Sequence, residues 1–212
     1  MEFSSGKLNF CNLAFFMLFE ELISAGVTAS QAGDSHQAID LFCSASSQNL
    51  NSALPQFLMG AEFAALGDMT QAEAAFANAT RLAPEFPMAR YQLGLVQFSS
   101  GRAAMGLLTW QPLLDLPDTD PLPHFVNGFA ALAQDRFEEA LAFYEQGLAR
   151  NTANPPLSGD IEKVMAGIRD AMARNAEAER ASNADAESAD AADASSNAHI
   201  LLANYQQNGP GH

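Results

Sequence analysis

The 212-residue sequence has few cysteines and few histidines, and each shortage argues against a class of function. The two cysteines, Cys11 and Cys43, lie far apart in unrelated contexts, so we expect two small buried side chains and no disulfide framework. The four histidines are scattered without metal-ligand spacing, and no glycine-rich phosphate loop is present. The sequence therefore predicts a protein that is not an enzyme and that uses no metal or cofactor.

Positive charge is also scarce. Ten Lys or Arg residues stand against 25 Asp or Glu residues, which gives a formal net charge of −15. Nucleic acids and anionic membrane surfaces are bound by clusters of Lys and Arg, so neither is an expected partner. We expect partners to be proteins or peptides, basic ones included.

Long apolar runs are missing as well. The run Leu8–Phe19 is too short to span a bilayer and contains Asn9 and Asn12. We therefore expect no membrane span.

The same N-terminal run has three possible interpretations. It resembles the core of a signal peptide with a cleavage site at Val27–Ala29, which would make residues 1–29 the signal of an exported protein, although Glu20 and Glu21 are unusual there. It could instead be an N-terminal apolar helix or extension over 1–18, or an upstream addition to a chain that starts at Met17. A cytoplasmic protein is the main expectation.

The sequence does contain an internal repeat with a period of 34 residues, visible in four independent columns. The first column consists of Gly26, Gly60, Gly94 and Gly128. The second consists of Gly33, Gly67, Gly101 and Asp135. The third consists of Ala38, Ala72, Gly106 and Ala140, and the fourth of Phe42, Phe76, Trp110 and Tyr144.

Each repeat predicts two short helices joined by a turn. Gly60 lies inside the first helix, where its missing side chain lets the second helix cross closely. This close packing offsets the low helix propensity of glycine, which costs about 1 kcal/mol. Gly67 ends this helix because glycine accepts the left-handed conformation of a turn, and Asp135 is one of the few other residues that tolerate it. We expect Ala72 to face Gly60 and Phe76 to fill the space between units.

These residues resemble the tetratricopeptide repeat family, in which Gly, a Tyr-like residue, Ala, Phe, Ala and Pro recur over 34 residues. Residues 53–86 match best, through Met59, Gly60, Phe63, Gly67, Ala72, Phe76, Ala79 and Pro84. The resemblance implies an all-α, right-handed α-solenoid of about four helix-turn-helix units, at 19–52, 53–86, 87–120 and 121–154. It is weakest where the usual early apolar residue and terminal proline are replaced, at Gln56, Arg90, His124, Leu50, Asp118 and Thr152.

Two segments follow the repeats. Residues 155–174 have apolar positions at helical spacing and predict the C-terminal capping helix that a repeat stack needs. Residues 175–212 predict an acidic, disordered tail because its first part has no large apolar residue, and a short apolar segment follows at 199–205.

The resemblance also implies a binding surface, because the first helices of such units line a concave groove that takes an extended peptide or a helix. In this register the groove residues are Ile23, Val27, Phe57, Ala61, Ala64, Tyr91, Leu95, Phe98, Phe125, Phe129 and Leu132. The lining is apolar and lacks the Lys, Arg and Asn set with which chaperone-adaptor relatives hold a C-terminal carboxylate. Some of these aromatics would instead pack between units if the exposed face of the helix were shifted by one residue.

The sequence thus predicts a protein-interaction scaffold whose groove binds a hydrophobic or amphipathic segment. The occupant would be a partner protein, or the chain's own Ile200–Tyr205 or that of a neighbouring copy. The alternatives are a secretion-type chaperone that holds apolar segments of an exported protein, and a structural subunit that forms homo-oligomers through Phe10–Phe19. The alanine-rich composition is typical of a bacterial source.

Overall fold

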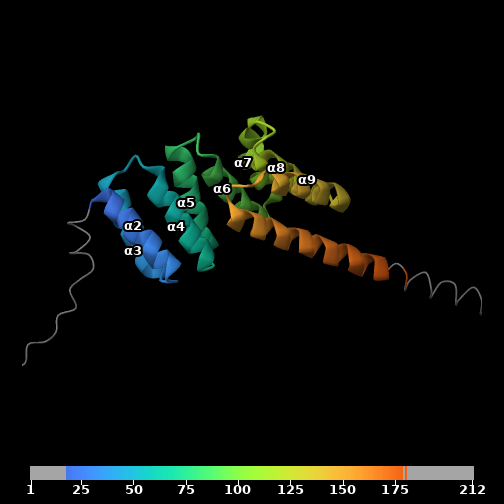
Figure 1. Ribbon diagram of the computed structural model, residues 1–212, viewed down its shortest axis with the longest axis horizontal. Coiled ribbons are helices and arrows are strands. Elements are labelled where there is room, and N and C mark those ends of the chain that lie inside the picture. Colours follow the sequence, from blue (N-terminus) through green and yellow to red (C-terminus); the bar gives the residue numbers. More distant parts are fainter. Residues whose placement is uncertain (1–17, 179, 181–212) are drawn as a thin grey trace, which may run out of the picture. The chain divides into compact units, whose positions relative to one another are not determined.

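The computed structural model describes residues 18–178 and residue 180, and every regular element in this part of the chain is a helix (Figure 1). The chain divides after Thr152 into two compact units, which are described separately. None of the helices described is both long and apolar enough to cross a bilayer. The predicted all-α fold is confirmed.

The first unit consists of four helix pairs that follow one another in chain order (Figure 1). The pairs are α2 (Phe19–Gln31) with α3 (Ser35–Gln48), α4 (Ala53–Ala65) with α5 (Met69–Leu82), α6 (Pro87–Ser99) with α7 (Ala103–Trp110), and α8 (Pro121–Leu132) with α9 (Phe137–Arg150). A 3₁₀ helix, η1 (Gln111–Asp115), continues directly from α7. Within each pair the helices pack together, and α3 packs on α4 as α5 does on α6, which is the arrangement of an α-solenoid.

The turns inside the pairs adopt the left-handed conformation that the second repeat column predicts. The φ angles are 81° at Gly33, 80° at Gly67, 77° at Gly101 and 56° at Asp135. In the first two pairs the next residue, Asp34 or Asp68, then caps the second helix by accepting a hydrogen bond of 3.0 Å from a backbone N–H three residues on. In these two pairs the glycine therefore forms the turn, and the aspartate after it caps the start of the second helix.

The close crossing of the two helices depends on the glycine in the first helix and on an aromatic ring from the second. A Cβ atom added at Gly60 would lie 2.7 Å from the ring of Phe76, which is only 1% exposed. The sequence assigned this space to Ala72, but it is filled by Phe76. Ala72 packs instead in a core cluster with Phe76 and with Leu93 and Val96 of the next pair.

The second unit contains a helix over residues 155–178. It runs four residues past the predicted end at 174, so the start of the predicted tail is helical rather than irregular. Its capping role remains a prediction. The N-terminal segment 1–17 and the apolar segment 199–205 lie outside the described residues.

One residue that the sequence predicts to be buried is exposed in the structure. Cys43 is exposed on α3 rather than buried, and it is not part of the core cluster to which Leu41, Phe42 and Ala45 belong. Core positions of the same helix, such as Phe42 and Ala45, are 1% and 0% exposed.

Replacing Gly60 by Ala should destabilise the first unit by about 1–2 kcal/mol, since an added methyl meets a ring that is packed on all sides and the gain in helix propensity offsets only part of the overpacking. Urea unfolding followed by helical circular dichroism measures the change. Gly167→Ala is the matched control, because a Cβ there meets nothing within 4 Å. Equal midpoints for wild type and Gly60→Ala would contradict the close crossing.

Candidate interaction site

Three of the residues predicted to line the concave groove lie in the core instead. Tyr91 and Phe125 are 0% exposed and Phe129 is 3% exposed. The physical reason is local space: the ring of Phe125 occupies the volume that a side chain at Gly147 would need, and Tyr91 stacks on Trp110 with ring centroids 5.8 Å apart. These three residues are therefore corrected from groove residues to core residues.

The other predicted groove residues keep some exposure, but most of them also pack between helices. They are Ile23, Val27, Phe57, Ala61, Ala64, Leu95, Phe98 and Leu132, of which Ala61 is exposed and the other seven are partly buried. The ring of Phe57 lies 4.9 Å from that of Phe86, and the ring of Phe98 lies 5.7 Å from that of Trp110. Peptide binding on this face remains a prediction, with little exposed apolar surface to support it.

Among the residues described, exposed large apolar side chains occur near α2, α3, α4 and α5, at Leu18, Leu50, Leu54, Leu66 and Met69, and three more occur together in α7 and η1. Met105 is 50% exposed, Leu108 is 65% exposed and Leu114 is 44% exposed. Next to them an open groove of about 530 Å³ lies between α7, η1 and α8. It is lined by Ala104, Leu107, Leu108, Gln111, Leu114, Val126, Asn127 and Ala130, and we call it the α7–α8 groove.

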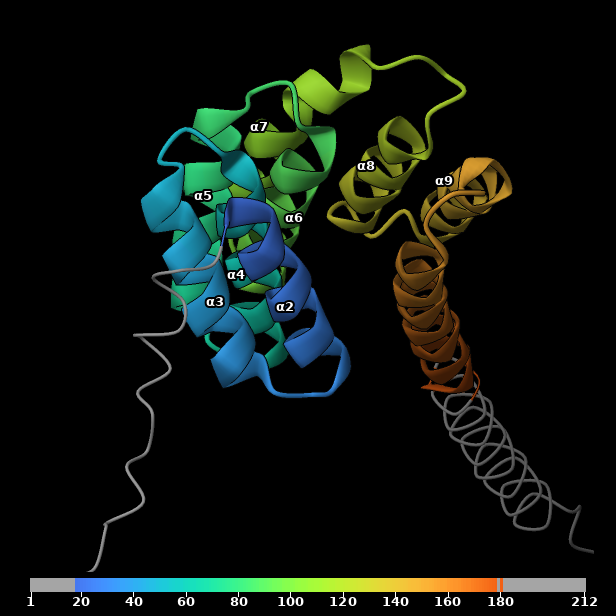
Figure 2. The ribbon, with the colours of Figure 1, turned by 60° about the vertical axis from the view of Figure 1, so that its left-hand side comes forward.

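The α7–α8 groove exists because the third pair is irregular. Helix α7 has 8 residues, whereas α3, α5 and α9 have 14 each. Pro112 has no N–H to continue the α-helix, and the N–H of Gln111 bonds to the carbonyl of Leu108 instead, which tightens the chain into η1. A loop then leads to α8, and Figure 2 shows it arching between η1 and α8. As a result α7 makes few contacts with α8, unlike α3 with α4 or α5 with α6.

The loop before α8 is held by polar contacts at Asp118. Arg150 of α9 donates from Nε to the Asp118 carbonyl at 2.7 Å and pairs with its carboxylate at 3.2 Å. His124, which is 5% exposed, lies with Nε2 3.0 Å from the same carbonyl. His124 therefore braces the loop. No group of three or more potential metal ligands occurs in residues 18–178.

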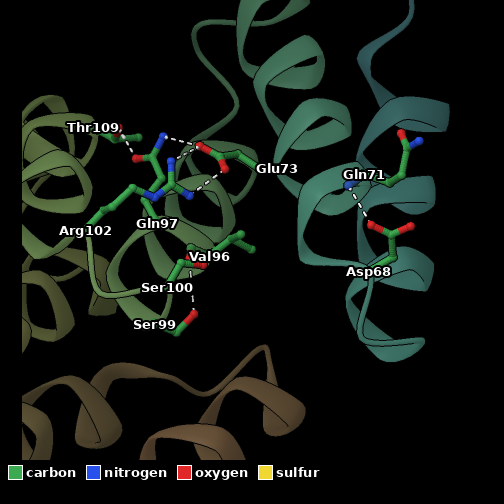
Figure 3. A network of polar contacts seen from close by, with 9 residues as sticks. All are labelled: Asp68, Gln71, Glu73, Val96, Gln97, Ser99, Ser100, Arg102 and Thr109. Atoms are coloured by element: carbon green, nitrogen blue, oxygen red, sulfur yellow. Dashed lines mark hydrogen bonds and ion pairs between the residues drawn. The ribbon is translucent and has the colours of Figure 1, made fainter.

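The preceding junction, between the second and third pairs, is closed by a polar network (Figure 3). Arg102 binds Glu73 through two nitrogen–oxygen contacts of 2.6 and 2.9 Å. Gln97, which is 8% exposed, donates to Glu73 at 3.3 Å and accepts from Thr109 at 2.6 Å. The network joins α5 and α6 to both ends of α7, through Arg102 at its start and Thr109 near its end.

The equivalent positions one repeat later cannot form such a network. The residue 34 positions after Glu73 is Leu107, which lines the α7–α8 groove. The residue 34 positions after Arg102 is Arg136, and it pairs with Glu139 of its own helix. The third junction is consequently apolar and open.

This groove was missed by the sequence-based prediction, which considered only the first helix of each unit. A signal was present in α7, because AAMGLLTW contains no charged residue. The corresponding helices carry charged or strongly polar residues at these outward positions, such as Asp40 in α3, Glu73 in α5 and Glu138 in α9. A comparison of second helices would have shown that α7 has Leu108 where the others have Asp40, Ala74 and Ala142.

No protein-family model matches the sequence, and no curated protein matches it either. Solved structures match in fold. A crystal structure of MamA aligns with 20% identity over 62% of this chain and 77% of that one, with a TM-score of 0.53. MamA from residue 41 to its end, from Desulfovibrio magneticus RS-1, aligns with 16% identity over 77% of this chain and 96% of that one, with a TM-score of 0.54. YrrB, described as a TPR protein with an unusual peptide-binding site, aligns with 17% identity over 71% and 76%, with a TM-score of 0.51.

The polar network should make the first unit sensitive to acid. Hydrogen bonding from Arg102 holds the pKa of Glu73 below its ordinary value, with burial opposing and Gln97 assisting. A depressed pKa in the folded state contributes stability above the unfolded-state value near 4.5, and that contribution is lost as the pH falls through the folded-state pKa. Glu73→Gln should therefore lower the urea midpoint at pH 7 and have a smaller effect at pH 3.

Glu139→Gln is the control for this experiment, because it removes an exposed carboxylate that pairs only within its own helix. It should change the midpoint less than Glu73→Gln at pH 7. A Glu73→Gln effect of equal size at both pH values would contradict the assigned role of the ionised carboxylate.

Proposed function

Because the chain has the fold of a tetratricopeptide-repeat solenoid, we propose that it is a non-enzymatic interaction module whose α7–α8 groove binds a hydrophobic or amphipathic segment of another protein. The observation that carries the proposal is an open groove whose eight lining residues include no charged side chain, and one of which, Leu108, is 65% exposed. The proposal moves the expected binding surface from the concave face to this junction.

The energetic argument concerns three side chains. Leu108, Met105 and Leu114 leave roughly half of their surface in water. Full burial of such a side chain contributes about 1.5–3 kcal/mol, so covering the exposed parts of all three contributes several kcal/mol to binding before entropy costs. Contiguous apolar surface of this kind is typical of interaction sites.

The size of the groove agrees with a ligand site. Its volume of about 530 Å³ lies within the range of protein pockets that bind ligands, which is roughly 300–1,000 Å³. Two uncharged amides, Gln111 and Asn127, are the polar groups of its lining and could orient an occupant. A chaperone for apolar segments would use the same contact and differ only in how it releases its client.

Peptides selected on the full chain from a random display library should be rich in Leu, Ile and Phe, and Leu108→Asp should weaken their binding by about tenfold or more, because it places a charge in an apolar contact. Fluorescence anisotropy with the selected peptides measures the loss. Leu108 is mostly exposed, so the variant should keep its helical circular dichroism.

The matched control is Leu66→Asp. Leu66 is 46% exposed at the C-terminal end of α4, outside the groove lining. Its substitution should leave binding unchanged. If the selected peptides bind wild type, Leu108→Asp and Leu66→Asp equally well, the groove is not the binding site.

A further inference from the structure

The hydrogen-bonding capacity of the α7–α8 groove restricts the conformation of its occupant. Gln111 and Asn127 are the polar side chains among its lining residues. An extended peptide would bring one N–H and one C=O per residue, and each would need a partner once buried. Two amides cannot supply these partners. An α-helix satisfies its backbone internally and needs only an apolar face.

The origin of the groove points to the same occupant. In the first two pairs, the buried face of the second helix packs against the next helix. Phe76 of α5, for example, packs with Leu93 of α6. The corresponding residue of α7, Trp110, is also buried, and the groove lies beside this face, between Ala104, Leu107 and Leu108 of α7 and Val126, Asn127 and Ala130 of α8. The groove therefore has the ridges of two helices, into which the side chains of a third helix can pack.

The net charge of the first unit favours basic residues on the polar face of that helix. Residues 18–152 contain 15 Asp or Glu, five Arg and no Lys. Three of the arginines, Arg102, Arg136 and Arg150, already pair with carboxylates of the chain. The negative charge of this unit is thus largely uncompensated from within.

Part of this negative charge lies beside the groove. Asp115 directly follows the lining residue Leu114 and is exposed, and the next loop carries Asp118 and Asp120. Asp115 makes no ion pair with any residue in the part of the chain described. A Lys or Arg on an occupant would find a carboxylate at the η1 end of the groove.

We propose that the α7–α8 groove binds an amphipathic α-helix of another protein, with large apolar side chains on one face and Lys or Arg beside Asp115. The inference rests on the proposed function and adds the conformation and charge of the partner. The chain's own tail is a poor occupant, because residues 175–212 contain six Asp or Glu and one Arg and so share the sign of the groove's surroundings.

Three synthetic 18-residue peptides test the proposal by fluorescence anisotropy on the full chain. The first has Leu at helical spacing and Lys elsewhere, the second has Glu in place of Lys, and the third has the composition of the first in an order that gives no apolar face. The first should bind at least about tenfold more tightly than the other two. Leu108→Asp should remove this binding, and Leu66→Asp should not.

A charge reversal tests the contact at the end of the groove. Asp115→Lys should weaken the Lys peptide several-fold, while Glu85→Lys, an equal change at an exposed position after α5, should have a smaller effect. Equal losses in the two variants would overturn the local contact and leave only attraction by the net charge.

The remaining outcomes separate this inference from the proposed function. Equal binding of the Glu and Lys peptides, lost in Leu108→Asp, would overturn the charge preference and leave the groove as the binding site. Equal binding of the scrambled peptide would overturn the helical occupant. A full-length Leu201→Asp, Leu202→Asp variant that binds the Lys peptide about tenfold more tightly than wild type would overturn the foreign partner in favour of the tail. Binding of all peptides that is insensitive to Leu108→Asp would contradict the proposed function itself.

Discussion

The contact between a glycine of the first helix and an aromatic ring of the second sets the geometry of every helix pair. Because no Cβ separates them, the ring of Phe76 lies directly against the backbone at Gly60, and the other pairs repeat this contact. In the third pair the ring is that of Trp110, whose Nε1 donates to the carbonyl of Tyr91 at 2.8 Å. The approach is closer there, since even an alanine at Gly106 would place its Cβ 2.8 Å from a backbone oxygen of the facing helix.

The α7–α8 groove follows from how that third pair ends. Trp110 is the last residue of α7, Pro112 prevents the helix from continuing, and η1 and the loop keep α8 from covering α7. One repeat earlier the position of Leu107 is occupied by Glu73, which pairs with Arg102 (Figure 3). The irregularity that weakens the stack at this junction thus leaves an apolar surface available to a partner.

The sequence predicted the helical fold, the repeat period and the left-handed turns well, because each depends on a single residue type and its spacing. A positive φ at Gly67 or Asp135 can be predicted without knowing which residues lie near it in the fold. The site was predicted poorly for the opposite reason. Whether Phe125 lies in a groove or in the core depends on the volume opposite it, and Gly147 leaves that volume free.

The sequence by itself determined where the helices and turns form. Both depend on the backbone preferences of residues that are close together in the chain, and the 34-residue period repeats the same pattern. It also determined the net negative charge. Only the tertiary structure decided which apolar side chains remain in contact with water. Leu93 and Leu108 have similar hydrophobicity and both lie on helices, yet one is 8% exposed and the other 65%, because Leu93 packs against Ala72 and Phe76 of the preceding pair whereas Leu108 lines an open groove.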